Sequence, residues 1–95
     1  MTTQTGIDYS KVDEILSSYN FKKSNLTNTK LEYANLYCTN LENANLYYTN
    51  LTGADVACAD LSNANLIYAN LSNTNFKKSR WGDYIPTNTY KCRFW

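Results

Sequence analysis

Residues 34–53 read ANLYCTNLENANLYYTNLTG, and leucine occupies every fifth position of this stretch, at 36, 41, 46 and 51. The same register runs from Phe21 to Trp81, thirteen times without a gap, with Leu, Val, Phe or Trp at each step. A small side chain (Ala, Ser or Thr) stands two residues before nearly every one of them, and Tyr19 is the exception. Internal repeats of this kind indicate a stacked architecture rather than independent helices or strands.

Neither regular element accommodates a period of five. In an α-helix a five-residue step turns the side chain by about 140°, so the leucines would spiral around the axis without forming a stripe. In a flat strand the faces alternate at every residue, so an odd step would place successive leucines on opposite faces. A chain that bends once per pentad resolves the conflict. Each short side then directs two residues inward, the large one and the small one two before it, and three outward.

The number of sides in one coil follows from comparing the stretch with shifted copies of itself. Shifting residues 34–53 by twenty matches half of the positions, whereas a shift of fifteen matches fewer and a shift of ten nearly as many. A four-sided coil of twenty residues therefore fits better than a three-sided one. Residues twenty apart would then lie above one another on the same side of the coil.

The pentads ANLYC, TNLEN, ADLSN and ANLIY resemble those of the pentapeptide-repeat proteins. The resemblance implies an all-β fold, a right-handed quadrilateral parallel β-helix (a solenoid), with the large and small residues stacked inside. It covers about residues 20–83, so we divide the chain into an N-terminal segment over 1–19, the β-helix over 20–83 and a C-terminal cap or tail over 84–95. The apolar residues Val12, Ile15, Leu16 and Tyr19 share one helical face, which predicts a short cap helix over 8–18.

Two columns of outward residues suggest a contact surface. Tyr47 stacks with Ile67 and Tyr48 with Tyr68, so all four side chains are expected on one side of the rod. Such an apolar patch either forms a protein-binding face or packs across the strands, for example under the C-terminal tail. The Asn or Asp before each central residue is expected to form a structural ladder of side-chain hydrogen bonds.

Cys38 and Cys58 also stand twenty apart, just outside the core. They are interpreted as free thiols, with a disulfide as the alternative, because adjacent strands lie within disulfide range. Two thiols in a chain without histidine cannot complete a tetrahedral metal site, so no metal or cofactor is expected. The pairs of lysines at 22–23 and 77–78 are interpreted as guards against strand addition at the two ends.

The composition gives little support for catalysis, nucleic-acid binding or membrane insertion. The net charge is +1, and the sequence has no histidine, no nucleophile motif and no glycine-rich phosphate loop. Glu42 and Asp60 could lie near each other, but both are expected to be solvated. No export signal or apolar span is seen, so a cytoplasmic location is expected.

The favoured hypothesis is therefore a non-enzymatic scaffold that binds an unidentified protein partner or a second copy of itself. Some members of the resembled family imitate DNA and bind type II topoisomerases such as DNA gyrase, which is the alternative function. The short rod and its weak acidity disfavour that alternative, because imitation of DNA requires an extended anionic surface.

Overall fold

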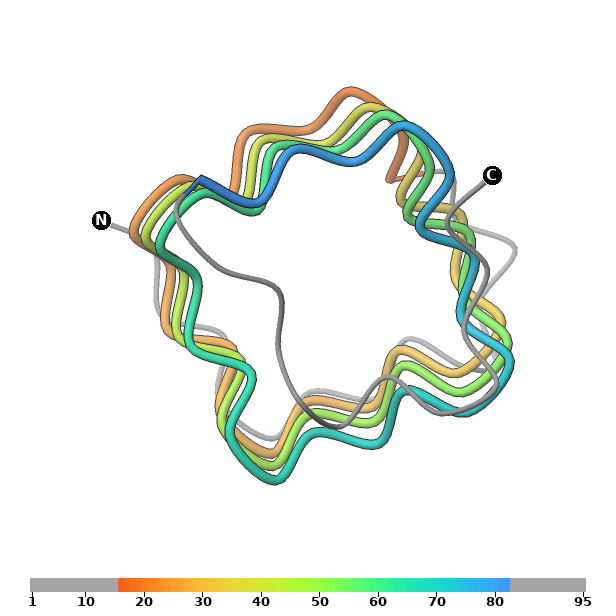
Figure 1. The fold of residues 1–95 in the computed structure, drawn as a ribbon. Helices are drawn as coiled ribbons and strands as arrows, with labels where there is room; N and C mark the ends of the chain where they lie inside the picture. The colour runs from red at the N-terminus through yellow and green to blue at the C-terminus, as the bar shows by residue number, and fades with distance from the viewer. Residues whose placement is uncertain (1–15, 83–95) are drawn as a thin grey trace.

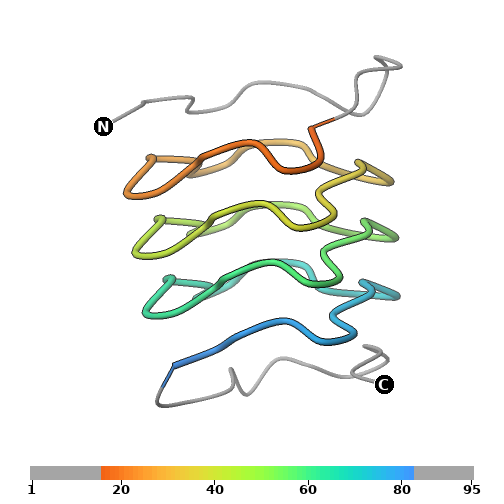
Figure 2. The same ribbon diagram turned by 90° about the horizontal axis from the view of Figure 1, so that it is seen from above.

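The structure is a computed structural model that describes residues 16–82. Over this range the chain winds into a tube that is roughly square in cross-section when viewed along its axis (Figure 1). Successive coils stack directly on one another, at a regular spacing (Figure 2). The predicted C-terminal tail over 84–95 lies outside the described residues. No helix in the described range is long and apolar enough to cross a membrane.

Each coil contains twenty residues, as the sequence comparison predicted. Every β-bridge in residues 16–82 is parallel and joins residues twenty apart. The paired residues are Asn20 with Asn40, Asn25 with Asn45, Lys30 with Asn50, Asn35 with Asp55, Asn40 with Asp60, Asn45 with Asn65, Asn50 with Asn70, Asp55 with Asn75 and Asp60 with Arg80. One bridge residue per pentad means four bridges per coil. The four-sided reading is thus confirmed.

The described chain contains these isolated bridges but no longer strand and no helix, because it turns once in every pentad. In the pentad that begins at Leu31, for example, the Ala34 N–H donates to the Leu31 carbonyl at 3.1 Å. The third residue of that turn, Tyr33, has a φ of +61°. A hydrogen bond across four residues with a positive φ only at the third is the geometry of a type II turn. The same left-handed position recurs at every fifth residue from Ser18 to Lys78.

The interior of the tube holds the two columns that the pentad pattern predicted. Large side chains at the central positions and small ones two residues earlier are buried, and they form one continuous core from Leu16 to Phe76. Some of the small residues are polar, and the hydroxyls of Thr39, Thr49, Thr74 and Ser79 bond to backbone carbonyls. The Thr49 hydroxyl donates to the Leu26 carbonyl at 2.7 Å, and the Thr74 hydroxyl to the Leu51 carbonyl at 2.8 Å. These bonds cross from one coil to the coil before it.

The asparagine column has a second role beside the predicted ladder. Within each pentad the Oδ1 atom of the Asn or Asp accepts a hydrogen bond from the backbone N–H two residues later, as from Lys22 to Asn20 at 3.0 Å. Along the stack, the Asn65 side-chain amide donates to Asn45 Oδ1 at 3.5 Å and that of Asn75 to Asp55 Oδ1 at 3.3 Å. The predicted ladder therefore forms at these two steps of the column. In addition, the side chain caps the turn of its own pentad, as Asn and Asp do in Asx-turns, which the sequence analysis did not predict.

This capping completes the hydrogen bonding of the pentad. In the pentad of Leu46, the N–H groups of Leu46 and Tyr48 donate to the following coil, and that of Thr49 closes the turn. The N–H of Asn50 donates to the preceding coil, through the Thr29 carbonyl at 3.0 Å. The one remaining donor is the N–H of Tyr47, which donates to Oδ1 of the Asn45 side chain at 3.1 Å. A coil with all of its donors bonded is held at a fixed spacing from its neighbours.

The repeat begins earlier than the sequence register predicted. The Leu16 N–H donates to the Asn35 carbonyl at 3.1 Å, and the Tyr19 N–H closes a turn onto Leu16. Ser18 has a φ of +62°, which is not helical. The cap helix predicted over 8–18 therefore does not extend over Leu16–Ser18, which form a pentad turn. Residues 8–15 of that predicted helix lie outside the described residues.

Candidate functional site

Three tyrosines and an isoleucine project at one corner of the tube, from two successive coils. Tyr48, Ile67 and Tyr68 are exposed to 51%, 55% and 67%. Tyr47 is partly buried. The ring centroids of Tyr47 and Tyr48 are 4.6 Å apart, those of Tyr47 and Tyr68 5.9 Å, and those of Tyr48 and Tyr68 5.2 Å. We call these four residues the aromatic face.

The rings of the aromatic face are arranged as a cluster rather than as separate side chains. Tyr48 stacks on Tyr68 at an angle of 27°, while Tyr47 meets both of them edge to face. Both arrangements are favourable for aromatic rings at these distances. Burial raises the pKa of the Tyr47 hydroxyl, and the neighbouring Tyr48 and Tyr68 hydroxyls raise it further. The Tyr47 hydroxyl is therefore neutral at physiological pH.

The pentad explains why these side chains stand out from the tube. Tyr47 and Tyr48 occupy the second and third positions of a type II turn, as Ile67 and Tyr68 do twenty residues later, and both positions point outward. In the coil before, the same columns hold Thr27 and Asn28, so the apolar surface ends there. Sequence analysis placed the four residues together, and the structure confirms that juxtaposition, with three exposed and one partly buried.

The two cysteines predicted to stack are both free thiols in the structure, Cys38 exposed and Cys58 partly buried. The hydroxyl of Tyr37 lies with them. A hydrogen bond with Cys58, followed by the charges of Cys58 and Cys38, raises the pKa of Tyr37 to about 12. Desolvation is the main cause that raises the pKa of the Cys38 thiol, and the neighbouring Cys58 adds to it.

Sequence analysis singled out the two cysteines but missed Tyr37. One signal was available, because the column of Tyr37 continues with Ala57, whose small side chain is buried on an otherwise exposed position. A small residue below a large one leaves room for the larger side chain to turn toward its neighbours. A similar relationship joins Tyr33 and Gly53, where the tyrosine ring lies against the glycine.

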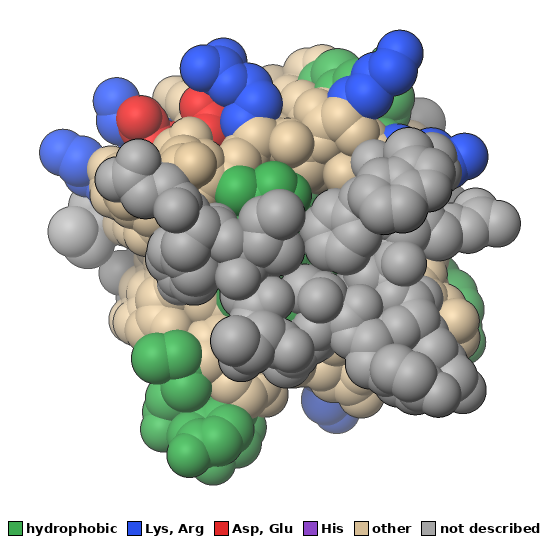
Figure 3. Space-filling view, in the orientation of Figure 1, with side chains coloured by type: hydrophobic (Ala, Val, Ile, Leu, Met, Phe, Trp, Pro, Cys, Tyr) green, Lys and Arg blue, Asp and Glu red, His purple; other side chains and the backbone are tan. Residues whose placement is uncertain are grey.

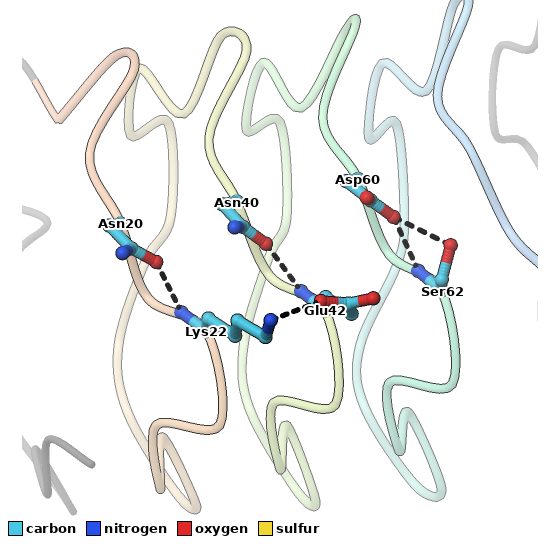
Figure 4. A network of polar contacts seen from close by, with 6 residues as sticks. All are labelled: Asn20, Lys22, Asn40, Glu42, Asp60 and Ser62. Atoms are coloured by element: carbon cyan, nitrogen blue, oxygen red, sulfur yellow. Dashed lines mark hydrogen bonds and ion pairs between the residues drawn. The ribbon is translucent and has the colours of Figure 1, made fainter.

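On the side of the tube that contains Asn20, Asn40 and Asp60, charged side chains form an ion pair or accept hydrogen bonds from their own turn. Figure 4 shows the column of Asn20, Asn40 and Asp60 with the residues that follow each of them. Lys22 forms an ion pair with Glu42 at 3.0 Å, between two partly exposed side chains. Asp60 instead accepts hydrogen bonds from the backbone N–H and the hydroxyl of Ser62, at 3.0 and 2.6 Å. Glu42 and Asp60 therefore have different partners and do not form a catalytic pair of carboxylates.

Charge is unevenly distributed over the surface of the molecule. Figure 3, in the same orientation as Figure 1, shows most of the visible lysine and arginine side chains along the upper rim, with acidic ones beside them. A hydrophobic group projects at the lower left of that view, with no charged side chain against it. Residues 16–82 contain six basic and four acidic side chains, a net charge of +2.

Comparison with solved structures identifies the fold. A pentapeptide-repeat protein from Nostoc PCC 7120 superimposes with a TM-score of 0.75 at 18% identity, over 98% of this chain and 76% of that one. Rfr23, a pentapeptide-repeat protein from the cyanobacterium Cyanothece 51142, gives a TM-score of 0.63 at 29% identity, over 97% of this chain and 63% of that one. Their fold is the right-handed quadrilateral β-helix, as the sequence predicted. No curated protein matches the chain.

The match extends to the sequence itself. The family described as Pentapeptide repeats matches in eight copies, over residues 16–46, 24–57 and 44–80. These ranges include Leu16 and so agree with the early start of the repeat in the structure. Together with the twenty-residue coil and the two buried columns, they show that the chain belongs to the pentapeptide-repeat family.

Proposed function

We propose that this protein is a non-enzymatic scaffold whose aromatic face binds another protein. The single observation that carries the proposal is the cluster of Tyr47, Tyr48 and Tyr68, whose rings contact one another while Tyr48, Tyr68 and the neighbouring Ile67 stay more than half exposed. Tyrosine is enriched in the centres of protein interfaces, where charged residues are depleted. The aromatic face has that composition.

The tube favours binding because it holds the rings in place before a partner arrives. The N–H groups of Tyr47 and Tyr48 are both bonded, to the Asn45 side chain at 3.1 Å and to the Ile67 carbonyl at 3.1 Å. Their rings also limit each other's rotation through the 4.6 Å contact. Association therefore requires little additional ordering of this surface, and less of the interaction energy is lost to entropy.

The alternative function, imitation of DNA toward a type II topoisomerase, has no comparable support. That mechanism requires rows of negative charge, whereas residues 16–82 carry a net charge of +2. Their acidic side chains are also separated, with Glu42 paired to Lys22 and Asp60 bonded to Ser62. Membership of the family brings the fold but not this activity.

The proposal is tested with a double variant, Tyr48→Ala with Tyr68→Ala, and a matched control, Tyr33→Ala. Tyr33 is a single tyrosine in the same turn position but on another side of the tube, and it is 76% exposed. Self-association is measured by light scattering after size-exclusion chromatography. Other partners are captured on each immobilised variant and compared by quantitative mass spectrometry, and a captured protein is then purified and titrated.

The expected result is a partner, or a second copy of the chain, that binds the wild type and the Tyr33→Ala control equally. The double variant should weaken that binding by at least about tenfold, the effect of losing a small interface hot spot. If the chain is monomeric and the wild type and the double variant capture the same proteins in the same amounts, the aromatic face is not a binding surface.

A further inference from the structure

Cys38 and Cys58 occupy the same position in two successive coils, on a side of the tube that the proposed function does not use. The parallel bridges Asn35 to Asp55 and Asn40 to Asp60 flank them, so the two residues are in register. Their φ angles are 58° and 61°. Because the backbone conformation is the same in both, the two Cα–Cβ bonds point in the same direction.

The spacing of the coils determines what two parallel thiols can hold. Neighbouring strands lie about 4.8 Å apart, so the Cβ atoms of stacked residues are separated by about the same distance. The Cα spacing is within disulfide range, as the sequence analysis noted, but a disulfide also requires Cβ atoms about 3.5–4.5 Å apart, which is closer than parallel Cα–Cβ bonds bring them. The coils are held at their spacing by hydrogen bonds from Cys38 N–H to the Ala57 carbonyl at 2.9 Å and from Cys58 N–H to the Lys77 carbonyl at 2.8 Å. A disulfide would strain them.

A metal ion between the sulfurs fits the same spacing without strain. A zinc–thiolate bond is about 2.3 Å long and a copper(I)–thiolate bond in a linear site is slightly shorter, so a linear sulfur–metal–sulfur unit spans at most about 4.6 Å, close to the spacing of the coils. Among residues 16–82 no group of three or more His, Cys, Asp or Glu side chains could hold an ion, so a four-coordinate zinc site cannot be assembled there. Two thiolates instead suit a soft cation that accepts two ligands, and copper(I) is the biological ion of that type.

We propose that Cys38 and Cys58 form a two-coordinate site for copper(I). Two cysteines without histidine fall short of a tetrahedral site, which is why the sequence predicted no metal, but a two-coordinate ion needs no further ligand. On binding, one copper(I) ion replaces the two thiol protons, which are released to solvent, and no oxidation or reduction takes place. The resulting site carries one net negative charge, and Lys78 follows Cys58 in the same column to offset it.

The surroundings of the pair allow an ion to enter and be retained. Cys38 is exposed, so the ion can arrive from solvent, whereas Cys58 is partly buried. Tyr37 is 46% exposed and directly precedes Cys38 in the same turn, which places a polar side chain next to the pair.

The test uses the full chain with Cys92→Ser, which removes the one cysteine outside the described residues. Copper(I) is titrated anaerobically against a chromogenic copper(I) chelator of known affinity. We expect one copper(I) per chain, and X-ray absorption should show two sulfur ligands and no third. Adding either Cys38→Ser or Cys58→Ser should abolish competition with the chelator under conditions where the parent retains its copper.

Two further variants separate the column geometry from the mere presence of thiols. Cys38→Ser with Asn43→Cys keeps one exposed and one partly buried thiol in the same turn position, but on different sides of the tube, and should not compete for copper. Asn43→Cys with Asn63→Cys, in a chain lacking Cys38 and Cys58, rebuilds an in-register pair with φ angles of 58° and 60° and should recover binding.

The proposal would be overturned if the variant Cys38→Ser with Asn43→Cys bound copper(I) as tightly as the parent. A complex in which two chains share one ion, seen as a doubled mass, would also overturn it. Rapid and complete formation of a Cys38–Cys58 disulfide with dilute hydrogen peroxide, detected by peptide mapping, would also contradict it, because the coils would then be closer or more pliable than the spacing argument requires.

Discussion

The Thr49 hydroxyl donates a hydrogen bond of 2.7 Å to the carbonyl of Leu26, twenty-three residues earlier and one coil away. Both residues are completely buried. Replacing the threonine by the equally large valine removes this bond while keeping the volume. We expect Thr49→Val to lower the free energy of unfolding by about 1 kcal/mol, the net contribution of a buried hydrogen bond. Urea unfolding followed by circular dichroism measures the change.

Ser24 supplies the control for this prediction. Its side chain is as deeply buried, but its hydroxyl has no hydrogen-bond partner in the described part of the chain. Ser24→Ala therefore removes a polar group without breaking a bond, and we expect stability to be unchanged or slightly increased. If Ser24→Ala lowers the free energy of unfolding as much as Thr49→Val does, then the volume of the small buried side chains, and not their hydrogen bonding, determines their contribution to stability.

Gly53 lies under the ring of Tyr33, in a left-handed turn position with a φ of +67°. A Cβ atom added there would stand 2.5 Å from two ring carbons of Tyr33. Tyr33 is 76% exposed, so its ring can rotate away. We expect Gly53→Ala to cost about 1–2 kcal/mol of unfolding free energy, mostly from the backbone conformation rather than from the ring.

The double variant Gly53→Ala with Tyr33→Ala distinguishes the two causes. If the backbone is responsible, the glycine substitution costs the same in the Tyr33→Ala chain as in the wild type. If instead the cost disappears once the ring is removed, the steric contact with Tyr33 was the main cause.

The left-handed turn position also shows what the sequence could and could not predict. Large and small side chains recur with period five, so the two buried columns, the bend in each pentad and the twenty-residue coil could all be predicted. The positive φ could not be predicted from its residues, since that position holds Asn28, Gly53 and Asn63 but also Tyr48 and Cys58. Glycine and asparagine favour such a conformation, whereas the repeat imposes it on tyrosine and cysteine.

The candidate site was predictable to a similar extent. The twenty-residue coil was enough to place Tyr48 beside Tyr68, and Cys38 beside Cys58. Which rings stack and which become partly buried depends on side-chain rotation, which the repeat does not determine. The contact of Tyr37 with the thiols and the partial burial of Tyr47 therefore emerged only in three dimensions.

Asn50 tests the capping role of the asparagine column. Its Oδ1 atom accepts hydrogen bonds from the N–H and the hydroxyl of Thr52, at 3.0 and 2.7 Å. Asn50→Ala removes the acceptor, and we expect a loss of about 1 kcal/mol of unfolding free energy, typical of a lost cap. Asn50→Asp keeps an oxygen at the same place, as Asp55 and Asp60 do naturally, so it should be nearly neutral. Equal losses in the two variants, measured by urea unfolding, would point to stacking along the column instead.

Asp60 gives the protein a predictable dependence on acid. The hydrogen bond from the Ser62 hydroxyl is the largest of the causes that hold the pKa of Asp60 below its usual value, and the backbone N–H of Ser62, Arg80 and Lys22 lower it further, against the opposing effect of burial. Because the folded pKa is the lower one, the charged form stabilises the fold above the unfolded pKa of about 3.9. That stabilisation is lost as the pH falls through the folded value.

Urea unfolding at a series of pH values from 6 downward, in wild type and Asp60→Asn, measures this contribution. The amide of the variant can still accept from Ser62 but does not titrate, so we expect its stability to fall less steeply in acid than that of the wild type. Glu42→Gln is the matched control, because Glu42 pairs with the partly exposed Lys22 across the surface of the tube. Two results would contradict this account: that the free energy of unfolding falls with pH as steeply in Asp60→Asn as in the wild type, or that Glu42→Gln reduces this fall more than Asp60→Asn does. In either case the Ser62 hydroxyl does not hold the Asp60 carboxylate in its charged form.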